Sequence, residues 1–151
     1  MALVLNEEQV MLKESAAGFL AENATVTHLR ALRDSNSERG FSDDVWNEMA
    51  QMGWAGIAIP EAFGGLGYGY TGLGLLLEQA GRNLSASPLQ STVLVAATLI
   101  GELGSSQQKE ELLPAIAAGQ KFISLALQEG PHHAPQQSAL SATLNEGDYI
   151  L

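Results

Sequence analysis

The sequence predicts an all-α amino-terminal domain followed by the first strands of an incomplete β-domain. Up to Gly119, apolar residues recur at helical spacing, and polar N-cap residues precede the expected helices. After Gly119 the pattern changes to alternation with a period of two, which is typical of strands. We therefore expect a helical domain over residues 1–120 and the start of a β-domain over residues 121–151.

The expected helices have clear N-terminal signals. Asn6 is the expected N-cap of the first helix, and Gln9, three residues later, completes a capping box. Ser42 is the expected N-cap of the third helix. Ser87 followed by Pro88, with the proline at the first helical position, predicts a helix that continues to about residue 103.

The helix ends are marked as well. The first helix is expected to end near Asn23, and a shorter second helix is expected over residues 26–33. Gly53 is the expected left-handed residue after the third helix. The last helix is expected to begin at Ser105 and to end at Gly119, where a glycine allows the chain to turn.

The glycine-rich stretch IPEAFGGLGYGY, residues 59–70, has two interpretations: a phosphate cradle or a tight loop between helices. A dinucleotide-binding loop needs Gly-x-Gly-x-x-Gly between a strand and a helix. Here Gly65, Gly67 and Gly69 are separated by single residues, and helical sequence surrounds them. The Gly-Lys-Ser/Thr of a Walker loop is missing from the sequence. The spacing therefore favours a tight loop.

Strand patterns follow the last helix. KFISLALQ, residues 121–128, alternates with both faces largely apolar, and SALSATL, residues 138–144, places its leucines on one face. Gly147 predicts a turn into a further strand that ends the sequence. Two or three strands with an open edge do not make a finished sheet, so we expect the remainder to follow in sequence or to come from another chain.

Composition excludes several classes of site. The net charge is −10, from 17 acidic and 7 basic residues, so the phosphate backbone of a nucleic acid would be repelled. The sequence has no cysteine, which excludes disulfides and thiolate metal ligands. No stretch has the roughly 20 apolar residues of a membrane span. The N-terminus lacks signal-peptide features, so we expect a cytoplasmic protein.

Few residues are candidates for chemistry. His132 and His133 are adjacent, and neighbouring histidines seldom share one metal ion, so no metal site is expected. Glu129 follows a predicted strand and could act as a base, although a lone carboxylate at a strand end is more often structural or solvated. Residues alone therefore predict no catalytic constellation.

The order of these features resembles the amino-terminal part of the acyl-CoA dehydrogenase family. FSDDVWNEMAQMGWAGIAIPEAFGGLGYGYTGLGLLLEQAGRNL is similar to the family pattern of an aromatic-anchored helix, a Pro-Glu and glycine loop, and a further helix. GSSQQKEELLPAIAAGQKFISLAL resembles the next stretch, which leads into the first strand of the β-domain. ATLNEGDYIL resembles a later strand and turn of that domain. The resemblance covers nearly the whole sequence.

This resemblance implies an oxidoreductase of fatty acid metabolism that binds FAD and introduces an α,β-double bond into an acyl-CoA thioester. It also implies an electron-transfer partner and a homo- or hetero-oligomer. The family's catalytic glutamate lies beyond residue 151, so this chain is expected to hold no catalytic residue and to be inactive alone. The residues implied as cofactor contacts are Leu125, Leu127 and Gln128, and those implied as substrate contacts are Ser91, Thr92 and Val95.

One departure from the family keeps a second function open. The family's first β-strand usually runs into Thr-Glu-Pro-x-Ala-Gly-Ser-Asp, whereas this chain reads Gln128, Glu129, Gly130 and Pro131. The alternative is therefore a non-catalytic subunit or scaffold that has lost flavin contacts and completes a partner's site. Flavin absorbance would favour the enzyme, and co-purification of a colourless protein with a homologous chain would favour the scaffold.

Overall fold

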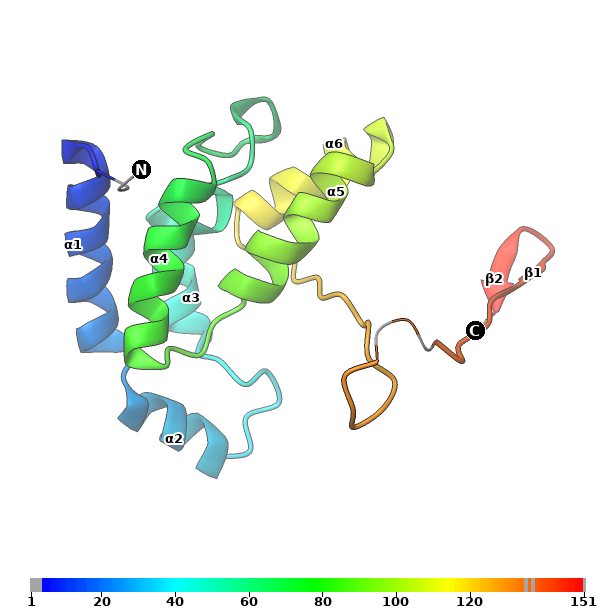
Figure 1. The fold of residues 1–151 in the computed structure, drawn as a ribbon, viewed down its shortest axis with the longest axis horizontal. Coiled ribbons are helices and arrows are strands. Elements are labelled where there is room, and N and C mark those ends of the chain that lie inside the picture. Colours follow the sequence, from blue (N-terminus) through cyan, green and yellow to red (C-terminus); the bar gives the residue numbers. More distant parts are fainter. Residues whose placement is uncertain (1–3, 135, 137, 151) are drawn as a thin grey trace.

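The computed structural model describes residues 4–134, 136 and 138–150, and it confirms a helical domain followed by a short β segment (Figure 1). The elements are, in order, α1 (Glu7–Asn23), α2 (Val26–Asp34), α3 (Asp43–Gln51), the short helices η1 (Trp54–Gly56) and η2 (Glu61–Phe63), α4 (Tyr70–Asn83), the π-helix η3 (Leu89–Ala96), α5 (Ala97–Leu103), α6 (Ser106–Ala117), β1 (Thr143–Asn145) and β2 (Asp148–Ile150). Among the described residues, none of the helices is long and apolar enough to cross a membrane.

The predicted caps of α1, α3 and α6 are confirmed. Asn6 Oδ1 accepts a hydrogen bond from the Gln9 amide at 2.8 Å, and Gln9 Oε1 accepts one from the Asn6 amide at 3.0 Å. The Ser42 hydroxyl accepts from the Val45 amide, and Ser105 forms a second capping box. These bonds satisfy amide groups that a helix start leaves unpaired, which is why local sequence predicted them.

The core forms where α1 lies against α4, with η1 packed beside them. Leu20 of α1 and Leu76 of α4 are completely buried, and the Phe19 ring meets the Trp54 ring edge-on at 5.4 Å between centroids. A second apolar cluster, which includes Leu113 and Ile116, joins α6 to α5 and the loop before η2. Together the two clusters account for the helical patterning of the sequence.

The glycine stretch is a tight loop between η2 and α4, as the sequence favoured. Gly64, Gly67 and Gly69 have positive φ angles of 77°, 60° and 86°, which side chains rarely adopt. A Cβ on Gly65 would lie 2.0 Å from the Ile59 carbonyl oxygen, so the two backbone segments approach too closely for any other residue. The glycines therefore close the turn that leads from η2 into α4.

The helix after the proline differs from the prediction at its start. Ser87 was expected to be the N-cap, but Pro88 occupies that position and no side chain caps the helix. The helix begins at Leu89 with π-helical hydrogen bonding, in which the Ala97 amide donates to the Thr92 carbonyl five residues earlier. It continues as α5 to Leu103, close to the predicted end.

The strand predicted over residues 121–128 was wrong, because that segment forms no strand in the structure. A strand is defined by pairing, and no neighbouring strand lies beside this segment among the described residues. The strand predicted over 138–144 is confirmed only at its end, where β1 pairs with β2 in an antiparallel hairpin. The predicted turn is confirmed, with Glu146 and Gly147 both at positive φ. Residue 151, the end of the last predicted strand, lies outside the described residues, and the boundary at residue 120 stays a prediction.

Candidate functional site

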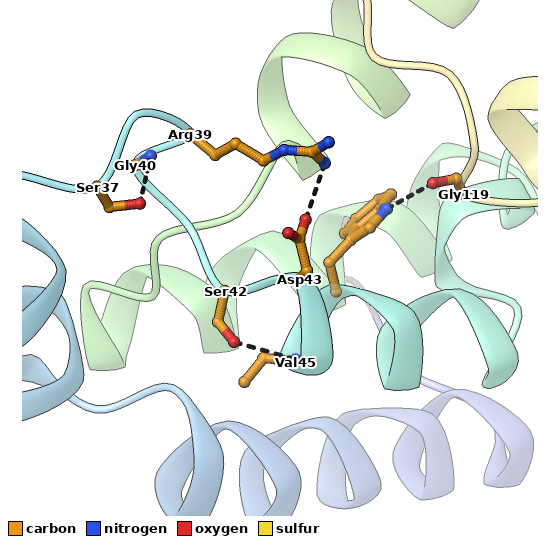
Figure 2. Close-up of polar contacts among 8 residues, drawn as sticks. Ser37, Arg39, Gly40, Ser42, Asp43, Val45 and Gly119 are labelled. Carbon is orange, nitrogen blue, oxygen red and sulfur yellow. Dashed lines mark hydrogen bonds and ion pairs between the residues drawn. The ribbon is translucent and has the colours of Figure 1, made fainter.

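The chain that leaves α6 is fixed to the helical domain by an aromatic cluster. The indole Nε1 of Trp46 donates a buried hydrogen bond of 2.8 Å to the Gly119 carbonyl (Figure 2). Three residues later, the Phe122 ring lies 5.8 Å from the Trp46 ring and 5.3 Å from the Phe41 ring. These contacts hold residues 119–122 against α3 without any strand pairing.

A second anchor joins this segment to η3. The Thr92 hydroxyl donates to the Ile123 carbonyl at 2.9 Å and is also within 3.2 Å of the Ile123 amide, from which it accepts. Thr92 is only 1% exposed, and the Ile123 side chain packs on the α5–α6 cluster. The Thr92 side chain therefore satisfies both the amide and the carbonyl of Ile123, which are not paired with another strand.

Beyond Ile123, the segment and η3 enclose an open groove of about 670 Å³. Its lining residues come from η3 and the turn before it, and from the segment after Ile123: Ser87, Gln90, Ser91, Val95, Ser124, Leu125, Ala126, Leu127, Gln128 and His133. The groove thus brings together five of the six residues implied as cofactor or substrate contacts. Thr92 is the exception, because its buried hydroxyl is bonded to Ile123 and it lines an adjoining cavity instead.

The predicted cofactor residues present an apolar surface with one polar end. Leu125 and Leu127 are about half exposed, at 53% and 50%. The Gln128 amide nitrogen lies 2.9 Å from His133 Nδ1, so this pair holds the polar end of the groove. Two accessible leucines beside an amide suit one edge of a flat heterocycle such as a flavin, which needs apolar contact on its face and hydrogen bonds at its rim.

Glu129 has a structural role in the described chain. Its carboxylate accepts hydrogen bonds from the Ser138 hydroxyl at 2.6 Å, the Ala139 amide at 2.7 Å and the Leu140 amide at 3.1 Å. The Ser138 bond, followed by the two backbone bonds, lowers the pKa of Glu129. A carboxylate with a lowered pKa and three donors is a poor proton acceptor, which supports the structural interpretation of this residue.

The sequence interpretation missed five groove residues: Ser87, Gln90, Ser124, Ala126 and His133. Ser87, Ser91 and Val95 recur at intervals of four, a spacing that places side chains on one helical face and could have identified Ser87. Nothing in the sequence indicated His133, because the loop that brings it to Gln128 has no local periodicity. Among the described residues, no three His, Asp or Glu side chains gather as a metal site would require.

Comparison with known proteins assigns the family. The model of the acyl-CoA dehydrogenase N-terminal domain matches residues 6–120. Acyl-CoA dehydrogenase IpdE2 of Mycolicibacterium smegmatis is 31% identical over 116 residues, which cover 76% of this chain and 36% of that protein. The chain belongs to the acyl-CoA dehydrogenase family, and its resemblance to that family is confirmed.

Solved structures agree on the fold. A variant of the Tcur3481-Tcur3483 steroid ACAD superposes with a TM-score of 0.81 at 34% identity, covering 95% of this chain and 38% of that one. A chain of the ChsE4-ChsE5 complex from Mycobacterium tuberculosis has the same TM-score at 22% identity, covering 99% of this chain and 39% of its own length. The chain therefore spans little more than a third of the length of these relatives.

Proposed function

We propose that this chain is the amino-terminal part of a flavin-dependent acyl-CoA dehydrogenase and supplies one wall of the cleft in which the acyl group meets the flavin. The observation that carries the proposal is the groove between η3 and residues 124–128. It joins the residues implied as substrate contacts to those implied as cofactor contacts, although they lie some thirty positions apart in sequence. Family membership supplies the reaction class.

The groove residues have distinct roles in this proposal. Ser91 and Val95 would line the acyl end, while Leu125 and Leu127 would offer apolar contact to the flavin and Gln128 would offer it a hydrogen bond. When bound, FAD supplies the acceptor for the hydride that leaves the acyl β-carbon. The chain's own contribution is to orient the acyl group along the Val95 side of the groove.

The remaining elements of the proposal concern the whole protein. Residues 1–120 form the helical domain and residues 121–151 begin the middle β-domain. The catalytic glutamate, most of the flavin site and the surface for an electron-transfer partner lie outside these residues. The complete protein is an oligomer that works in the cytoplasm.

Binding of acyl-CoA to the 151-residue protein tests this assignment. Isothermal titration with octanoyl-CoA should give weak binding that Val95→Trp reduces at least about fivefold, since an indole fills the groove. Leu99→Trp is the matched control, because Leu99 lies one turn further along on α5 and is 37% exposed but does not line the groove. Equal loss in both variants, or none in Val95→Trp, would show that the acyl group binds elsewhere.

A second function is favoured by the polar end of the groove. The Gln128 amide is already paired with His133, and the family's usual threonine is replaced there. This suits a non-catalytic subunit that has lost flavin contacts and completes the site of a homologous chain. A fold relative occurs in the ChsE4-ChsE5 complex, which supports such pairing. Purification decides between the two: a yellow protein supports the enzyme, and a colourless protein bound to a homologous chain supports the scaffold.

A further inference from the structure

The groove does not end at Ser91, because a second cavity of about 420 Å³ adjoins it. Ser87, Ser91 and Ser124 line both spaces, so the two spaces meet at these three residues. Ser87 and Ser91 flank Pro88 on one side, and Ser124 follows the Thr92-bound Ile123 on the other. An acyl group that lies along Val95 and passes this point would enter the second cavity with its far end.

The three serines where the two spaces meet offer hydroxyl groups that are little used within the protein. Ser91 donates to the Pro88 carbonyl at 3.5 Å, which is a long hydrogen bond. Within the described part of the chain, the hydroxyls of Ser87 and Ser124 have no intramolecular partner. Each can therefore donate to, or accept from, an oxygen atom of a ligand without breaking a strong internal bond.

Arg39, whose side chain is 55% exposed, also lines this second cavity. Its guanidinium lies 5.5 Å from the centre of the Phe122 ring. Arg39 Nη1 also donates to the Asp43 carboxylate at 2.8 Å (Figure 2). Nε and Nη2 make no other hydrogen bond to the residues that the structure describes. Arg39 is therefore held in place by stacking and still has donors to offer.

The net charge of the Arg39–Asp43 pair decides whether this cavity suits a neutral or an anionic oxygen of a ligand. Asp43 balances the charge of Arg39, so the ion pair is close to neutral and offers a ligand carboxylate little net attraction. A hydroxyl or a ketone oxygen accepts from Arg39 or a serine without bringing a charge. The protein's net charge of −10 further disfavours an anionic end group.

We propose that the acyl groove continues past the three serines into the Arg39 cavity, and that the protein takes acyl-CoA thioesters with a neutral oxygen, a hydroxyl or ketone, at the end distant from the thioester. This inference rests on the proposed function and specifies its substrate class. The apolar middle of the site, at Val95, then holds the hydrocarbon between two polar ends.

Paired titrations of the 151-residue protein test the inference. Saturated acyl-CoAs from hexanoyl to dodecanoyl are each compared with their ω-hydroxy and ω-carboxy counterparts. At the length that reaches Arg39, the ω-hydroxy compound should bind about threefold to tenfold more tightly than the unsubstituted one, with the ω-carboxy compound no tighter than the unsubstituted one. Shorter chains should show no preference, because their oxygen remains among the apolar side chains.

Arg39→Met should remove most of this preference, while Arg82→Met should keep it. The control is matched because Arg82 also forms an i,i+4 ion pair of 2.8 Å, with Glu78, but lines neither space. Equal binding of hydroxylated and plain chains at every length would overturn the inference and leave the proposed function standing. Tightest binding of the ω-carboxy compounds would also overturn it. If no acyl-CoA binds, the proposed function fails together with the inference.

Discussion

Replacement of Gly119 by alanine should destabilise the protein. Gly119 lies where α6 has ended and the segment that forms the groove begins. Gly119 has φ +73°, and an added Cβ would lie 2.6 Å from the Ala50 Cβ and 3.2 Å from Trp46 Nε1. The left-handed conformation costs a non-glycine residue about 1–2 kcal/mol. The steric conflict adds about 1–3 kcal/mol, since it must be relieved by shifting α3. We therefore expect a loss of about 2–5 kcal/mol in the free energy of unfolding.

The assay is urea unfolding followed by tryptophan fluorescence, because Trp46 reports on this contact directly. Gly74→Ala is the matched control: Gly74 lies within α4, and a Cβ there would meet nothing within 4 Å. That change should stabilise the protein by about 0.5–1 kcal/mol, the usual preference for alanine over glycine in a helix. If Gly119→Ala unfolded at the same urea concentration as the parent protein, the buried Trp46–Gly119 contact would not fix the segment as described.

Two further predictions concern the segment after α6, and a third concerns the activity of the 151-residue protein. Thr92→Val should speed hydrogen exchange of the Ile123 amide and destabilise the protein by about 1–3 kcal/mol, whereas Thr92→Ser should preserve slow exchange; equal exchange in both variants would contradict the double hydrogen bond. The bonds to Glu129 should be present above the ordinary carboxyl pKa and lost as the pH falls through the lowered folded-state pKa of Glu129. NMR should show the Ala139 amide signal moving as the pH falls through that pKa, and Glu129→Gln should give a weaker contact whose Ala139 signal does not change with pH. The 151-residue protein with octanoyl-CoA, FAD and an artificial electron acceptor should show no turnover, and a rate above the buffer control would place a base within it.

Sequence reasoning succeeded where the determining contacts are local. The capping boxes at Asn6 and Ser105 involve side chains three residues apart, so spacing alone identifies them. The left-handed glycine after α3 follows from the same logic, since Gly53 has φ +80°. Helix identity was therefore readable from short windows of sequence.

Sequence reasoning failed where the contacts are distant. The alternation in residues 121–128 resembles a strand, but the structure holds Ile123 by a threonine from η3, thirty-one residues earlier. Helical spacing placed Thr92 with Ser91 and Val95, yet it could not show that a carbonyl and an amide lie beside the Thr92 hydroxyl. The cavity at Arg39 depends on the turn before α3 meeting the segment after α6, a meeting that no local pattern encodes.

The most direct test of the proposed acyl groove is to map where acyl-CoA binds. The backbone amide signals of the 151-residue protein are followed in NMR spectra during titration with octanoyl-CoA. If the acyl group lies in the groove, the shifted signals should cluster at residues 87–95 and 124–128, its two sides. Shifts centred instead on the glycine loop at residues 64–69, with the groove signals unchanged, would contradict it.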